Sequence, residues 1–187
     1  PAGTTYSWPA PTAPTTLTTF GSGTAQSIIS GTLSNSTNND QTAVYNVTPT
    51  SPQGCPGALF TATINVHPTP IVANLTSTIC SGQTFNVVPN NNPVTNIIPS
   101  NINYTWSTPT GTGFTGGALQ SNPVTSISQT LNNTTVDPVT ATYLVTPSTT
   151  FSCQGAAFNV VVTINPSPTV TFSPAPPPPQ PPDRAET

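Results

Sequence analysis

The sequence predicts an all-β fold made of two tandem β-sandwiches, the first of them incomplete, followed by a proline-rich C-terminal tail. Three observations support this fold class: a long internal repeat, apolar side chains at every second position, and turn-forming residues between the apolar segments. The 25 prolines among 187 residues leave little room for long helices, because proline breaks a helix in its interior. We therefore expect strands throughout the folded part of the chain.

The internal repeat has a constant offset of 98 residues, the distance from Tyr6 to Tyr104. Residues 6–72 align without a gap with residues 104–170, and about a third of the aligned residues are identical. A fixed spacing of this length indicates an array of similar domains.

The boundary between the two units lies at Pro68 and Pro70, which stiffen the connecting segment and recur at Pro166 and Pro168. The first unit lacks the counterpart of residues 69–98. We therefore predict three parts: an incomplete sandwich at residues 1–68, a complete one at residues 69–168, and a tail at residues 169–187.

Each unit contains segments with one apolar face. Residues 42–48 place Ala43, Tyr45 and Val47 on one side, and residues 60–66 alternate in the same way. Period-2 alternation puts one face of a strand in the core and the other in water. We expect the two cores to include Trp8, Tyr45, Phe60, Ile64, Trp106, Tyr143, Phe158 and Val162.

Charge is almost absent from the chain. There is one basic residue, Arg184, and four acidic ones, two of which lie beside Arg184 near the end of the sequence. This composition excludes a basic surface for nucleic acid and a polybasic membrane-binding surface. The apolar segments are also too short to insert into a membrane.

Three cysteines in so polar a chain indicate an oxidising compartment. We expect a disulfide between Cys80 and Cys153, because both fall in the complete unit, and an unpaired or externally paired Cys55. A bridge between Cys55 and Cys80 is the alternative, although it would cross the domain boundary. Free thiols in a reducing compartment are the second alternative.

No catalytic residue, metal site or cofactor is predicted. Catalysis by acid and base needs titratable groups that converge, and the units offer only His67, Asp40 and Asp137. His67 is expected to be a solvated linker residue, and two distant carboxylates do not supply the six to eight oxygens that calcium prefers.

Glycosylation is the modification that the composition permits. Six Asn-X-Ser/Thr sequons occur, a number close to chance in a chain so rich in Asn, Ser and Thr. A threonine-rich segment near the N-terminus is a candidate for sugars on hydroxyl groups. The candidate residues are Asn35, Asn46, Asn74, Asn103, Asn132, Asn133, Thr12, Thr15 and Thr16.

Several motifs together resemble the PKD-like, immunoglobulin-like repeats of very large cell-surface adhesins of Bacteroidetes, including the gliding-motility adhesin. The motifs are Ile-Cys-Ser-Gly-Gln at 79–83, Tyr-Thr-Trp at 104–106, Ala-Thr-Tyr-Leu-Val-Thr-Pro at 141–147, Cys-Gln-Gly at 153–155 and Ile-Asn-Pro-Ser-Pro at 164–168. The resemblance implies immunoglobulin-like sandwiches in a secreted or cell-surface array that works in adhesion or surface motility.

Three functions compete at this stage. The first is a non-enzymatic structural or adhesive module of an extracellular repeat protein, whose partners are neighbouring repeats and surface glycans. The second is a subunit of an extracellular fibre whose protomers donate strands to one another, because an incomplete sandwich exposes an unpaired edge. Here the tail segment Thr169–Phe172 is one potential donor. The third is a carbohydrate-binding module.

Overall fold

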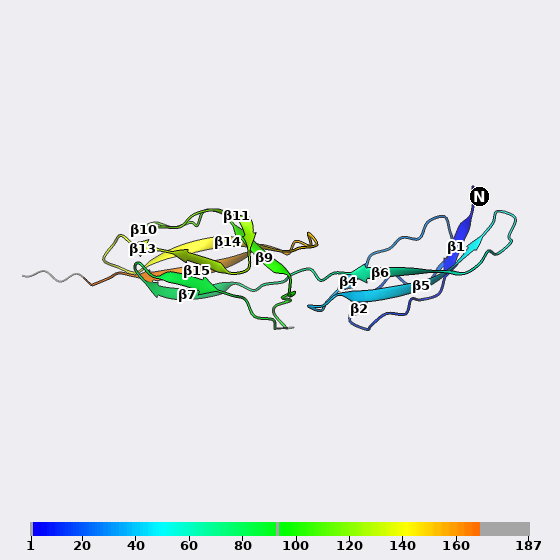
Figure 1. Cartoon of the computed structure of the whole chain (residues 1–187), viewed down its shortest axis with the longest axis horizontal. Helices are drawn as coiled ribbons and strands as arrows, with labels where there is room; N and C mark the ends of the chain where they lie inside the picture. Colours follow the sequence, from blue (N-terminus) through cyan, green and yellow to red (C-terminus); the bar gives the residue numbers. More distant parts are fainter. Residues whose placement is uncertain (1, 93, 169–187) are drawn as a thin grey trace, which may run out of the picture.

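The computed structural model describes residues 2–92 and 94–168, and these form two β-structured units placed end to end (Figure 1). The described residues contain strands, turns and bends but no helix, so the predicted fold class is confirmed. The first unit uses strands within residues 5–66 and the second uses strands within residues 75–165. The predicted proline-rich tail, including the potential donor Thr169–Phe172, lies outside the described residues.

The second unit is built on a five-stranded sheet in the order β11–β9–β14–β15–β7. A smaller layer covers this sheet, formed by the pairs β8–β12 and β10–β13. The main-sheet strands are Gln120–Val124, Ile102–Trp106, Val139–Thr149, Phe158–Asn165 and Leu75–Cys80, in sheet order. The covering strands are β8 (Thr84–Val87), β12 (Ile127–Thr130), β10 (Phe114–Thr115) and β13 (Asn132–Asn133).

The core of the second unit lies between these two layers. Tyr143 is fully buried in the centre of β14, and Phe85 of β8 packs on it with ring centroids 5.2 Å apart. Trp106 adds a T-shaped contact at 6.3 Å and donates its indole N–H to the Ala118 carbonyl at 3.1 Å. Each ring is thus buried without an unpaired donor, as expected of large aromatic residues in a core.

Strand β7 pairs with β15 in parallel, and this pairing decides the burial of β15. The register runs from Leu75 opposite Val160 to Cys80 opposite Asn165. With β14 on its other side, β15 is paired along both edges. Its four inward-facing residues Phe158, Val160, Val162 and Ile164 are at most 3% exposed.

The first unit repeats this plan without counterparts of three strands, β7, β8 and β12. Its sheet has the order β3–β1–β5–β6, and a short pair β2–β4 lies against it. The strands are Gly23–Gln26, Thr5–Trp8, Gln41–Thr50 and Phe60–Val66 in the sheet, with Leu17–Thr18 and Ser34–Asn35 opposite. Trp8 and Tyr45 are buried as their counterparts Trp106 and Tyr143 are. Within residues 2–92 and 94–168 no strand takes the place of β7 or β8 in the first unit, so β6 is an edge strand of its sheet.

The sequence predicts that Phe60 and Ile64 are core residues, as it does for Phe158 and Val162. Both side chains are less buried than these counterparts. Phe60 is 42% exposed whereas Phe158 is 3% exposed, and Ile64 is only partly buried. The reason is the edge position of β6, which has no strand of the β7 type beside it and no β8 layer above it.

Phe20 compensates for part of the missing layer. Its ring stacks on Tyr45 with centroids 4.3 Å apart, so it contacts the same tyrosine position that Phe85 contacts in the second unit. Gly31 makes this placement feasible, because a Cβ atom at that position would lie 2.1 Å from Cγ of Phe20. The first unit therefore keeps a core around Tyr45 although it lacks β8.

Matched alanine substitutions test the unequal cores. Phe158→Ala should lower the free energy of unfolding of the second unit by about 3–5 kcal/mol, the usual loss for a buried Phe. Phe60→Ala should lower that of the first unit by less than half as much. Each unit contains one tryptophan, so fluorescence during urea unfolding reports on both units. Trp8→Phe leaves only the signal of the second unit, and Trp106→Phe leaves only that of the first. Equal losses at the two positions would contradict this account.

Candidate functional site at the junction of the two units

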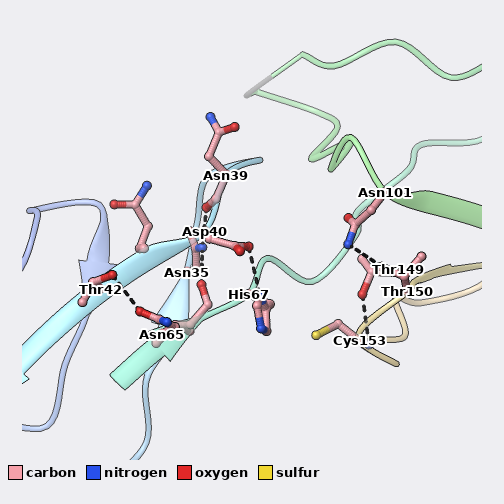
Figure 2. A network of polar contacts seen from close by, with 12 residues as sticks. Asn35, Asn39, Asp40, Thr42, Asn65, His67, Asn101, Thr149, Thr150 and Cys153 are labelled. Atoms are coloured by element: carbon pink, nitrogen blue, oxygen red, sulfur yellow. Dashed lines mark hydrogen bonds and ion pairs between the residues drawn. The ribbon is translucent and has the colours of Figure 1, made fainter. Parts of the chain in front are cut away.

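The junction is the place where ionisable, aromatic and sulfur-containing side chains gather (Figure 2). His67 follows β6, and its ring stacks on Phe151 of the β14–β15 hairpin at a centroid distance of 3.7 Å. The His67 Nδ1 lies 2.9 Å from Asp40 Oδ1, with side-chain exposures of 31% and 55%. Nδ1 has no well-directed hydrogen bond, so the contact with Asp40 is ionic in character when His67 is protonated.

His67 is therefore not the solvated linker residue that the sequence predicts. It lies between a loop of the first unit and a hairpin of the second, and links the two. The sequence carries no signal for this role, because the stacking partner Phe151 lies far along the chain and at an unmatched position of the repeat.

A cleft of about 410 Å³ opens beside these residues. The first unit contributes the loop at 38–40 and the second unit contributes residues 99–101 with Thr150 and Phe151. Asn101 donates to the Thr150 hydroxyl at 3.0 Å, and Asp40 is the one ionisable side chain among the lining residues. Amides and hydroxyls of this kind bind uncharged polar groups, but they supply no acid–base pair.

In each unit one asparagine holds the loop that precedes the longest strand, β5 or β14; Asn35 is buried and Asn133 is partly buried. In the second unit, Asn133 donates to the carbonyls of Asp137 and Ile164, both at 2.8 Å, and accepts from the N–H and hydroxyl of Thr135. In the first unit, Asn35 makes the same bonds to Asn39, Val66 and Thr37. These identical networks fix the loop to the end of the last strand of each sandwich. The repeat itself signals them, because the asparagine and the threonine recur at the offset of 98.

The candidate glycosylation residues fall into two groups. Asn35 and Asn133 have both amide hydrogens engaged within the fold, so a glycan there would require the loss of these bonds. The other candidates lie at the surface with partly or largely accessible side chains: Asn46, Asn74, Asn103, Asn132, Thr12, Thr15 and Thr16.

The ionisable groups outside the junction do not converge. Among residues 2–92 and 94–168, no group of three His, Cys, Asp or Glu side chains could hold a metal ion. Burial raises the pKa of Tyr104 and Tyr143 to about 12, because the phenolate is poorly solvated in the core. These hydroxyls therefore stay neutral at physiological pH.

The predicted disulfide between Cys80 and Cys153 is wrong, since all three cysteines are free thiols. Cys80 ends β7 opposite Asn165, the last residue of β15, whereas Cys153 lies in the hairpin before Phe158, the first residue of β15. The two cysteines thus lie near opposite ends of an eight-residue strand, about 20 Å apart at 3.3 Å per residue. A disulfide requires Cα atoms within about 7 Å.

Comparison with known families agrees with this architecture. The PKD-like domain family matches residues 1–70 and again residues 77–168. The chain belongs to the PKD-like domain family. A search of curated proteins found no match. PKD-like domains are generally non-catalytic and typically extracellular or surface-located, and the described residues form no helix able to cross a membrane.

The paired asparagines allow a controlled test. Asn133→Ala removes four hydrogen bonds that join the loop at 133–137 to the end of β15, so the second unit should lose about 2–4 kcal/mol of unfolding free energy. Asn132→Ala is the control, since this neighbouring side chain is exposed and its loss should stay within about 0.5 kcal/mol. Denaturant unfolding measures both. Similar effects at the two positions would show that the loop network does not stabilise the unit.

Proposed function

We propose that this PKD-like pair is a load-bearing module of an extracellular cell-surface repeat protein that works in adhesion. The observation that carries the proposal is the placement of the first and last strands of the second unit. Strands β7 and β15 are parallel neighbours, so the chain enters β7 at one end of the unit and leaves β15 at the other.

This placement determines how the unit responds to tension. Force applied along the chain pulls β7 and β15 in opposite directions, parallel to their lengths. The hydrogen bonds of the ladder, which spans six residue pairs, are then loaded together rather than one after another. Shear of a whole ladder resists more force than opening it from one end, which suits a protein that connects a cell to a surface.

The junction supports the same function. The 2.9 Å contact between His67 and Asp40 and the stacking of His67 on Phe151 fasten the linker to both units. Pro68 and Pro70 restrict the backbone of the same segment. Consecutive units are thereby held end to end (Figure 1), as in an extended stalk.

Single-molecule pulling in two geometries tests the load-bearing role. Pulling from the chain ends should unfold the second unit at high force and release about 30 nm, the contour of roughly 90 residues. Pulling between Cys80 and Asn165→Cys, in a Cys55→Ser, Cys153→Ser background, should open the same ladder from one end at a several-fold lower force. These two residues are direct partners in the ladder. Equal forces in both geometries would refute the shear mechanism.

Surface location is tested on intact cells that carry the natural protein. Antibodies against residues 2–168 should label unpermeabilised cells, and external protease should remove the label. Labelling that requires permeabilisation would contradict the extracellular assignment.

A further inference from the structure

The orientation of the two units depends on a very short segment, residues 67–69. On the side of the first unit, the Val66 carbonyl accepts a hydrogen bond from Asn35 at 2.9 Å, so the end of β6 is held within its own unit. On the side of the second unit, Pro70 is fully buried, and a Cβ atom at Gly155 would lie 2.1 Å from the Pro70 carbonyl oxygen. The side-chain contacts of residues 67–69 therefore decide how one unit is held against the other.

The His67 ring contacts both units (Figure 2). It lies flat against Phe151 of the second unit, with centroids 3.7 Å apart and an angle of 11° between the ring planes. Its Nδ1 lies 2.9 Å from Oδ1 of Asp40 in the first unit. This nitrogen is buried and has no hydrogen-bond partner among the described residues, so the nearby carboxylate determines which charge state of the ring is favoured.

The charge of His67 decides whether these contacts attract. In the neutral ring with its proton on Nε2, the Nδ1 lone pair faces the negative Asp40 oxygen, and the two repel. In the other neutral tautomer, the Nδ1–H is poorly aligned with that oxygen. The protonated ring attracts the carboxylate and also gains a cation–π attraction to the face of Phe151. Histidine ordinarily changes charge between about pH 5 and 8, so acidification over this range strengthens both contacts.

Few other titratable groups lie near this ring. The loop at 38–40 and the β14–β15 hairpin pack against it, and their titratable side chains are Asp40 and Cys153, whose sulfur points toward the first unit (Figure 2). The remaining carboxylate of the described residues is Asp137, in the loop joined to the far end of β15. His67 is the one histidine of the chain, so a single proton accounts for the response.

We propose that protonation of His67 locks the junction, so that the two-unit module stiffens in an acidic medium and becomes more compliant toward neutral and alkaline pH. The docked arrangement holds His67 between Asp40 and Phe151, whereas the undocked arrangement leaves its ring in water. The docked state therefore binds the proton more tightly, and by linkage the ratio of docked to undocked chains rises as the pH falls. This pH response goes beyond the load-bearing role and depends on the junction alone.

The expected size of the response follows from the exposure of the pair. His67 and Asp40 are 31% and 55% exposed, so solvent screens much of their attraction. An ion pair of this kind changes an equilibrium by about two- to fivefold. The ratio of docked to undocked chains should rise by that factor between about pH 8 and about pH 5.5.

Spin labels on Cys55 and Cys80 measure this ratio in the full chain. Both cysteines are exposed, and they lie at the outer ends of the two units, in the β5–β6 hairpin and at the end of β7 (Figure 1). Cys153→Ser prevents a third label and removes the thiol beside His67. Double electron–electron resonance should give a narrow distance population for docked chains and a broad one for undocked chains. At about 1 M salt the pH response should shrink, because salt screens exposed charges.

Three substitutions assign the response to its residues. His67→Asn, which matches the Asn165 of the second unit, and Asp40→Asn should each remove or strongly reduce the pH dependence. Asp137→Asn is the control and should keep it, because the loop bonds to Asp137 use its backbone carbonyl.

A distance distribution that is the same at both pH values in the parent chain would overturn the proposal. So would a pH response that survives His67→Asn, or one that keeps its full size in Asp40→Asn. The shear response of the second unit and the cell-surface labelling are measured at a single pH, so they can hold when the junction shows no pH response.

Discussion

The parallel ladder between β7 and β15 is the interaction on which the rest of the structure depends. It converts β15 from an edge strand into an internal one, and it brings β8 over the apolar face that β14 and β15 present. The buried aromatic core around Tyr143 exists in its complete form because both strands are in place. The same ladder connects the two ends of the unit, so the proposed resistance to tension has the same structural origin as the stability of the core.

The first unit serves as an internal comparison, because its sequence matches the second at the positions that form the core. Tyr45 and Tyr143 are both fully buried, and both tryptophans donate their indole N–H to a nearby backbone carbonyl. The difference is confined to the side where β7 and β8 would lie. The exposure of Phe60 is thus a consequence of the missing neighbour rather than of the residue itself. Stacking of Phe20 on Tyr45 limits that consequence, but it adds no strand to the edge of β6.

The sequence predicted the features that depend on local periodicity and failed where strand direction matters. Alternation at 42–48 and 60–66 correctly located β5 and β6, and the repeat located their counterparts in β14 and β15. Alternation, however, is identical for parallel and antiparallel neighbours, so the direction of β7 was hidden, and with it the separation of Cys80 from Cys153. The contacts of His67 arise between units and leave no pattern in either. The loops held by Asn35 and Asn133 could have been found, because their residues recur at a fixed spacing.

Amide hydrogen exchange of the full chain is the most direct test of the central claim, that β7 makes β15 an internal strand whereas β6 has one unpaired edge. We expect alternating protection along β6: amides that donate to β5 should exchange slowly, and those that point to the open edge should exchange close to the rate of an unstructured peptide. Along β15, with a strand on each side, both sets should be protected. Uniform protection along β6 in the monomeric chain would contradict the account.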